Sequence, residues 1–231
     1  MKFRAIIFDF YGTLVDDFAS SAGRNHAEFV EVLAVPSASF MKLWRETTEM
    51  RVVGAFQTVE ESIEYVCSLL GATLTADQLS RAVAIRLEMI KRTLIPRADA
   101  LDTLARLKTD GYKTGLLSNC SIEIPILWPE TAFADLFDAA VFSSRVGLKK
   151  PDPRIYHLAC ERLGVKPVDC LYIADGENHE LAAAAKVGLH SVLVRNTSRD
   201  NGSELLREAR EWQGDSIDSL THVLQLLRIS R

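Results

Sequence analysis

Five short and almost entirely apolar runs recur along this chain, and they restrict its fold more than any other feature. Each run has four residues and is bounded by polar residues or glycine. Strands that are buried on both faces of a parallel sheet have this pattern. The predicted strands are Ala5–Phe8, Thr114–Leu117, Ala139–Phe142, Leu171–Ala174 and Ser191–Val194.

Helical patterns separate most of these runs. They cover Ala98–Lys108, Pro153–Leu163 and Glu180–Val187, and Gly188 closes the last one. Alternating strands and helices predict an α/β fold with a Rossmann-like, doubly wound parallel sheet. Ligands of such sheets bind at the carboxyl ends of the strands.

The stretch between the first and second predicted strands has no strand pattern. Apolar residues recur in it at helical spacing, as at Ile63, Val66, Cys67 and Leu70. Proline and glycine residues divide it into about four helices. We therefore expect a core formed by residues 1–16 and 96–231 and an all-helical cap formed by residues 17–95. Because the cap follows the carboxyl end of a strand, we expect it to lie over the ligand site.

Composition narrows the class of protein. The chain has 231 residues, 48% of them apolar, with 27 basic and 31 acidic residues, and this balance argues against a nucleic-acid partner. No apolar stretch approaches the roughly 18 residues that span a bilayer. Four widely spaced cysteines favour free thiols in the cytosol. We expect a cytoplasmic protein with a small-molecule ligand, and the sequence leaves the oligomeric state open.

Polar residues follow the predicted strands in a suggestive series. Asp9 follows the first strand, Ser118 and Asn119 follow the second, Lys150 lies beyond the third, and an acidic segment begins at Asp175 after the fourth. The carboxyl ends of parallel strands meet at one edge of a sheet, so these groups should converge. Together they supply a nucleophile, donors for an oxyanion, a cation and a metal site.

This series resembles the signatures of the haloacid dehalogenase superfamily of hydrolases. The resemblance is carried by Asp9-Phe10-Tyr11-Gly12-Thr13, Ser118-Asn119, Lys150-Pro151-Asp152-Pro153 and the segment from Asp175 to Glu180. The motifs have the order found in the family, and the predicted cap lies where the smaller cap subtype of the family lies. The match covers about residues 3–16 and 96–195.

The first motif implies the catalytic centre. By the resemblance, Asp9 is the carboxylate nucleophile that forms an aspartyl intermediate. Gly12 permits the tight turn beside the substrate, and the Thr13 hydroxyl binds the transferring group. The alternative is that Asp9 is only a turn residue that accepts a backbone hydrogen bond.

The second and third motifs imply substrate contacts. Ser118, together with Asn119, would bind phosphate or carboxylate oxygens, although both residues are also good helix N-caps. Lys150 would be the catalytic cation beside Asp9, and Lys149 is expected to be solvated.

The fourth motif implies a metal. Related phosphatases hold Mg²⁺ with two acidic residues at these positions, the nucleophile and a main-chain carbonyl two residues after it. Asp175, Glu180, Asp9 and the Tyr11 carbonyl match this set, and oxygen ligands suit Mg²⁺. Dehalogenases of the superfamily have small neutral residues at the position of Asp175. Alternatively, Glu180 only stabilises the start of its helix.

Two features of the chain resemble the dehalogenases instead. Tyr11 stands where phosphatases of the superfamily carry the aspartate that protonates the leaving group. Trp44-Arg45 resembles a cap segment whose arginine binds the substrate carboxylate or the departing halide, although Trp44 could be cap core and Arg45 a surface residue. His179 is a possible substitute acid.

We expect foremost a Mg²⁺-dependent phosphatase of a small phosphorylated metabolite, acting through an aspartyl-phosphate. The alternatives are a metal-independent 2-haloacid dehalogenase that forms an aspartyl ester at Asp9, or a binding protein without turnover on the same fold.

Overall fold

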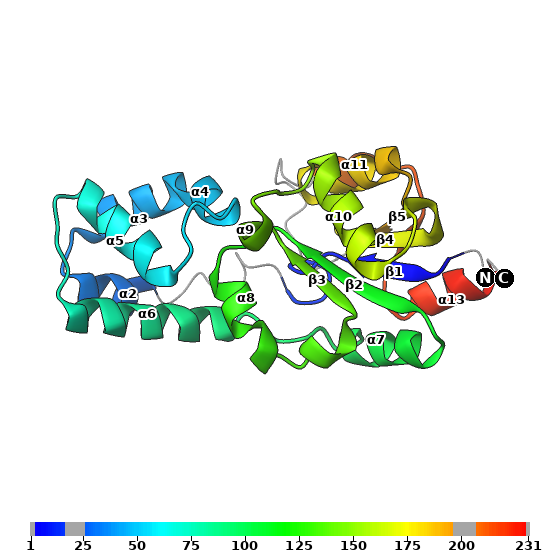
Figure 1. The fold of residues 1–231 in the computed structure, drawn as a ribbon, viewed down its shortest axis with the longest axis horizontal. Helices are drawn as coiled ribbons and strands as arrows, with labels where there is room; N and C mark the ends of the chain where they lie inside the picture. The colour runs from blue at the N-terminus through cyan, green and yellow to red at the C-terminus, as the bar shows by residue number, and fades with distance from the viewer. Residues whose placement is uncertain (1–2, 17–25, 196–206, 230–231) are drawn as a thin grey trace.

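The centre of the protein is a six-stranded parallel sheet (Figure 1). We describe it from a computed structural model that covers residues 3–16, 26–195 and 207–229. The strands are β1 (Ala5–Phe8), β2 (Lys113–Ser118), β3 (Ala139–Phe142), β4 (Cys170–Ala174), β5 (His190–Val194) and β6 (Ser216–Ile217). Their order across the sheet is β3-β2-β1-β4-β5-β6. The predicted Rossmann-like α/β class is confirmed.

The apolar runs located the strands closely. β1 and β3 have the predicted bounds, and the other three predicted strands are longer by one or two residues. β6 was missed because only two residues pair there, beside Leu193 and Val194 of β5.

Helices cover both faces of the sheet (Figure 1). α7 (Ala100–Thr109) and α13 (His222–Ile229) lie on one face, and α10 (Pro153–Leu163) and α11 (Glu180–Val187) lie on the other. Short helices and turns complete the core: α8 (Glu123–Leu127), α9 (Ser143–Val146), α12 (Arg207–Glu211), η1 (Trp128–Glu130), η2 (Ala134–Leu136), η3 (Pro167–Asp169) and η4 (Glu177–His179).

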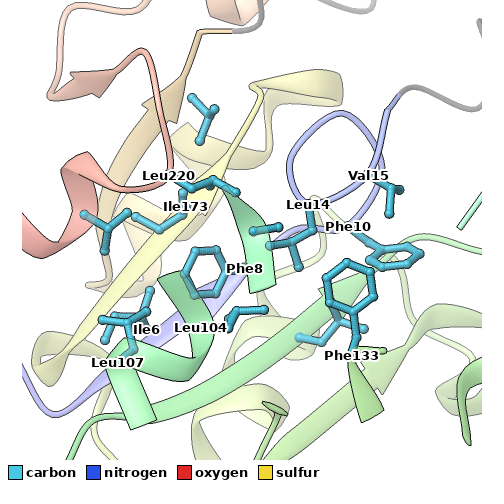
Figure 2. Packing of buried hydrophobic residues seen from close by; sticks show 14 of the residues in the cluster. Ile6, Phe8, Phe10, Leu14, Val15, Leu104, Leu107, Phe133, Ile173 and Leu220 are labelled. Atoms are coloured by element: carbon cyan, nitrogen blue, oxygen red, sulfur yellow. The ribbon is translucent and has the colours of Figure 1, made fainter. Parts of the chain in front are cut away.

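Both faces of β1 are buried, which explains why its sequence is apolar throughout. Ile6 and Phe8 belong to the apolar cluster beneath α7, where Leu104 and Leu107 meet them (Figure 2). Ile7 points to the opposite cluster beneath α10 and α11. Burying an apolar side chain of this size contributes about 1.5–3 kcal/mol, so β1 fixes the position of the residues that follow it.

The elements between β1 and α7 are all helical among the described residues. They are α2 (His26–Leu33), α3 (Ser37–Glu46), α4 (Thr48–Val52), α5 (Val59–Leu69) and α6 (Ala76–Lys91). They enclose an apolar cluster of their own around Phe29, Phe40 and Trp44, and they extend to one side of the sheet (Figure 1). Residues 17–25 of the predicted cap lie outside the described residues, and the division of the chain at residues 16 and 96 stays a prediction.

The two chain segments that lead toward and away from these helices lie side by side. Val15 pairs with Pro96 in an isolated antiparallel bridge, and Arg97 N donates to Leu14 O at 2.9 Å. The helical part is therefore tied to the core next to the turn that follows β1.

A second contact joins α4 to α9 of the core. Gly54, with a φ of +74°, approaches so closely that a Cβ placed on it would lie 2.1 Å from Ser144 O. Lys149 pairs with Glu49 of α4 in the same region. The side chain of Lys149, which was predicted to be solvated, is 34% exposed and also pairs with this cap carboxylate.

Within the described residues, the helices are too short or too polar to cross a membrane.

Replacing Gly54 by alanine should destabilise the protein more than the same change at Gly71. Both glycines have a φ near +70°, but a Cβ at Gly71 meets nothing within 4 Å. Gly71→Ala therefore carries only the left-handed strain of about 1–2 kcal/mol, whereas Gly54→Ala adds an overpacking cost of about 1–3 kcal/mol. Chemical denaturation measures both, and equal losses would contradict the close α4–α9 contact.

Candidate active site

The carboxyl ends of β1, β2 and β4 meet at one edge of the sheet, and the predicted site residues gather there. A pocket at this edge is lined by Asp9, Tyr11, Ser118, Asn119, Lys150, Glu177, Asn178 and Glu180. Asp9 and Asp175 directly follow β1 and β4, which are neighbours in the sheet. The topology thus places these two carboxylates side by side.

Asp9 is held by two donors. Thr13 Oγ1 donates to its Oδ2 at 3.1 Å, and Lys150 Nζ donates to its Oδ1 at 2.5 Å. Gly12 has a φ of +78°, which allows the turn that brings Thr13 back to the carboxylate. With 6% of its surface exposed, Asp9 is buried but borders the pocket.

Lys150 is the centre of the site. Its ammonium donates to Glu180 Oε2 at 2.6 Å and to the Tyr172 hydroxyl at 3.2 Å, in addition to Asp9. Burial alone would lower the pKa of Lys150, but the charges of Asp9 and Glu180 outweigh it and raise that pKa. Lys150 therefore stays a cation although only 4% of it is exposed.

Glu180 is the most constrained carboxylate of the site. Its Oε2 accepts from Lys150 and, at 2.6 Å, from the Tyr172 hydroxyl, whereas its Oε1 is buried without a hydrogen bond. Burial raises the pKa of Glu180 to about 7, against the opposing effect of Lys150. A carboxyl group with such a pKa is poised to exchange a proton near neutral pH.

Asn119 holds the main chain of Lys150. Its Nδ2 donates to Lys150 O at 3.0 Å, and Lys150 N donates to its Oδ1 at 2.8 Å. These two bonds position the lysine, and Asn119 also lines the pocket, as does the buried Ser118. The substrate-binding roles predicted for Ser118 and Asn119 remain proposals.

Three carboxylates are close enough to share a cation. Asp9, Asp175 and Glu180 each offer one oxygen within 4.8 Å of the others. Buried oxygens at this spacing suit Mg²⁺, and a cation would satisfy Glu180 Oε1. The donors therefore fit the predicted metal, and the Tyr11 carbonyl stays a proposed fourth ligand.

Tyr11 forms a wall of the pocket toward the cap helices. Its hydroxyl shares a hydrogen bond of 3.0 Å with Thr93 Oγ1. Burial raises the pKa of the phenol, an effect larger than the opposing hydrogen bond to Thr93. The raised pKa makes Tyr11 a weaker proton donor at neutral pH than a carboxylic acid at that position.

Other residues singled out from the sequence lie apart from the pocket. Arg45 is exposed on α3 and is not among the residues that line the pocket, whereas Trp44 is buried in the cap cluster. His179 is exposed and does not line the pocket either. The substrate-binding role of Arg45 stays a prediction without a contact that supports it.

Sequence reasoning missed Tyr172. This residue lies in β4, where a fully buried phenol interrupts an otherwise apolar strand. A buried tyrosine hydroxyl needs a polar partner. A tyrosine in a strand predicted to be buried could therefore have indicated a polar group close to that strand. Glu177 and Asn178 were also missed as lining residues because they lie in a turn without a defined pattern.

The comparisons with known proteins agree with this geometry. The family model for haloacid dehalogenase-like hydrolases matches residues 3–188. The chain belongs to this family.

Its relatives include enzymes of two kinds. It is 30% identical to (S)-2-haloacid dehalogenase 4A of Burkholderia cepacia, over 83% of this chain and 82% of that protein. It is 26% identical to glyceraldehyde 3-phosphate phosphatase of Methanopyrus kandleri, over 83% of this chain and 84% of that protein. The structure of a 2-haloacid dehalogenase from Pseudomonas syringae pv. Tomato DC3000 has the same fold, with a TM-score of 0.68 at 18% identity over 99% and 100% of the two chains.

Replacing Lys150 by methionine should strongly destabilise the protein, because it leaves the Asp9 and Glu180 carboxylates buried without their cation. We expect a loss of about 3–5 kcal/mol in the free energy of unfolding. Lys149→Met, at the neighbouring and more exposed ion pair, should cost about 0–1 kcal/mol.

The double variant Lys150→Met/Glu180→Gln should recover part of the loss, because it removes one of the stranded charges. Denaturant titration of the variants measures these differences. A Lys150→Met protein as stable as Lys149→Met would contradict the central role of this ammonium.

Proposed function

We propose that this hydrolase releases halide from small 2-haloacids through an ester on Asp9. The observation that carries the proposal is Tyr11, which stands at the position of the leaving-group acid and whose buried phenol holds its proton. A halide departs without being protonated, so this reaction needs no acid there. The similarity to 2-haloacid dehalogenases over most of the chain supports the same reaction.

In the first step, an Asp9 oxygen attacks the carbon that bears the halogen. The carbon–halogen bond breaks, its electron pair leaves with the halide, and an ester forms between Asp9 and the substrate. Thr13 and Lys150 hold the Asp9 carboxylate at its two oxygens, which fixes the direction of attack.

In the second step, water attacks the carbonyl carbon of the Asp9 ester. Glu180 is the proposed base for this water, because its Oε1 has no hydrogen bond and its pKa of about 7 is suited to proton uptake. A proton of the water passes to Glu180, the acyl–oxygen bond breaks, and the departing alkoxide takes that proton back from Glu180 and leaves as the 2-hydroxyacid. The second proton of the water passes to solvent. Asp9 returns to a carboxylate.

We further propose that the substrate is a small molecule and that the protein works in the cytosol. The pocket at the sheet edge is small and lined mainly by polar residues. All four cysteines are buried free thiols, which is consistent with a reducing compartment.

Asp175, the third carboxylate of the site, favours a second candidate function, that of a Mg²⁺-dependent phosphatase. Asp9, Asp175 and Glu180 place three negative charges around a single lysine. An anionic phosphate would enter this region only with further positive charge, which Mg²⁺ held by these residues supplies when bound. Asp9 would then attack phosphorus instead of carbon.

The two candidates differ in their response to a chelator. Halide release from a panel of 2-haloacids should persist in chelator, because no step of the ester mechanism uses a metal. Asp9→Asn should lower this rate by at least about 10³-fold, since an amide is a poor nucleophile. Halide and phosphate release are measured in parallel, with and without Mg²⁺.

Asp16→Asn, the same substitution at an exposed position, is the matched control and should keep the wild-type rate. Phosphate release that requires Mg²⁺ and is lost in Asp175→Asn, without halide release, would contradict the first candidate and support the second. If neither activity is found, the remaining alternative is a binding protein that has the same fold but no turnover.

A further inference from the structure

Two of the four free cysteines are in contact with each other. Cys160 of α10 and Cys170 of β4 have their Sγ atoms 4.0 Å apart. Both side chains belong to the apolar cluster beneath α10 and α11. Cys67 and Cys120 lie in two other apolar clusters, in the cap helices and on the opposite face of the sheet. Cys160 and Cys170 are named here the thiol pair.

The thiol pair lies directly beneath a turn at the surface. Cys160 is in the last turn of α10, and Cys170 is the first residue of β4. The turn between them is bonded to both cysteines, since Val165 N donates to Cys160 O at 3.1 Å and Cys170 Sγ donates to Lys166 O at 3.3 Å. Lys166 and Val168 are exposed. Local opening of this short turn would therefore admit a small oxidant to the buried thiols.

The contact between the two thiols makes them chemically unequal. The hydrogen bond from Cys170 lowers the pKa of Cys160 more than burial raises it. The same contact, followed by burial, raises the pKa of Cys170. A thiolate is the form that attacks a peroxide, so Cys160 reacts first and Cys170 supplies the second sulfur. Burial raises the pKa of Cys67 to about 11 and that of Cys120 to about 12, which keeps both protonated.

We propose that the thiol pair forms a reversible disulfide when hydrogen peroxide oxidises the protein, and that this disulfide lowers turnover at the active site. The Cys160 thiolate attacks one peroxide oxygen and becomes a sulfenic acid, while the O–O bond breaks. The second oxygen leaves as hydroxide and takes up the proton that Cys160 had lost.

The sulfur of Cys170 then attacks the sulfur of Cys160. The S–S bond forms, the S–O bond breaks, and the hydroxyl group leaves as water with the proton of Cys170. The two thiols together lose two electrons and two protons, and one hydrogen peroxide is reduced to two molecules of water.

Two tyrosines connect the thiol pair to the active site. Tyr156 lies one helical turn before Cys160 on the same face of α10, and Tyr172 lies two residues after Cys170 on the same face of β4. Their rings pack edge to face with centroids 5.5 Å apart. The Tyr172 hydroxyl donates to Glu180 Oε2 at 2.6 Å, and the Tyr156 hydroxyl donates to Glu180 O at 3.0 Å. The packing of α10 on β4 therefore holds both the thiols and Glu180.

Closing the disulfide disturbs this packing. Bonded sulfur atoms are about 2.05 Å apart, so the two Sγ atoms must approach each other by about 2 Å. Close packing leaves the buried cysteines little freedom to turn, so we expect α10 to move with Cys160. The tyrosine hydroxyls then shift against Glu180, and a misplacement of about 1 Å can cost about 10²-fold in rate. This second part of the inference rests on the proposed function, in which Glu180 is the base.

Simple packing is the competing explanation for the thiol pair. A free cysteine behaves as a small apolar residue, and two of them in contact need not react. That explanation predicts that peroxide links Cys160 to Cys170 no more readily than it oxidises Cys67 or Cys120.

Mass spectrometry of the wild-type chain separates the two explanations without any variant. The protein is treated with hydrogen peroxide and digested without a reductant. We expect a peptide in which Cys160 is linked to Cys170, two hydrogens lighter than the two thiol peptides together, and its loss after dithiothreitol. Cys67 and Cys120 are the internal controls and should remain thiols. Cys160 and Cys170 that stay reduced, carry only sulfinic or sulfonic acid, or link two separate chains would overturn the disulfide.

Halide release tests the effect on turnover. Peroxide should lower the wild-type rate by at least about tenfold, and dithiothreitol should restore it. Cys160→Ala and Cys170→Ala, each compared with its own untreated rate, should change by less than about twofold. Cys67→Ala removes a buried thiol outside the pair, so it is the matched control and should lose activity as the wild type does.

The outcomes for the disulfide and for the reaction are distinguishable. If the linked peptide forms but no haloacid is turned over, the proposed function fails while the disulfide stands. Unchanged turnover in a fully linked protein, or equal inactivation of Cys160→Ala by peroxide, would overturn the effect of the disulfide on the active site.

Discussion

The rest of the site depends on the hydrogen bonds that the buried ammonium of Lys150 donates to the carboxylates of Asp9 and Glu180. The parallel order of β1 and β4 brings Asp9 and Asp175 together at one edge of the sheet, and Glu180 joins them from the start of α11. Carboxylates this close repel one another, and burial strengthens the repulsion. Lys150 offsets it by bonding to Asp9 and Glu180, and Asn119 fixes the main chain that carries the lysine.

The same arrangement is compatible with both candidate reactions. In both proposed reactions, Lys150 neutralises Asp9 and Glu180 and holds Asp9 for an attack on carbon or on phosphorus. Tyr11 favours a leaving group that needs no proton, whereas the additional charge of Asp175 favours a cation in the site. We propose that the balance between these two residues decides which of the two reactions takes place.

The core and its catalytic edge were predictable from the sequence because they depend on local patterns. Buried strands are apolar on both faces, and residues that follow parallel strands must meet, so Asp9, Lys150 and Glu180 could be placed together in advance. The positions of the cap side chains could not be predicted in this way, because the packing of several helices decides which face of each helix is covered. Arg45 is accordingly exposed, while Arg51 and Arg86, which no motif marks, are the buried cations.

The central claim is that Asp9 forms an ester with the substrate carbon, and isotope incorporation tests it most directly. During turnover of a 2-haloacid in chelator and in water labelled with heavy oxygen, the attack of water on the ester carbonyl places solvent oxygen in the Asp9 side chain. Mass spectrometry of the peptide that contains Asp9 should therefore show the label in that residue. Label found only in the released product, with Asp9 unlabelled after many turnovers, would contradict the account.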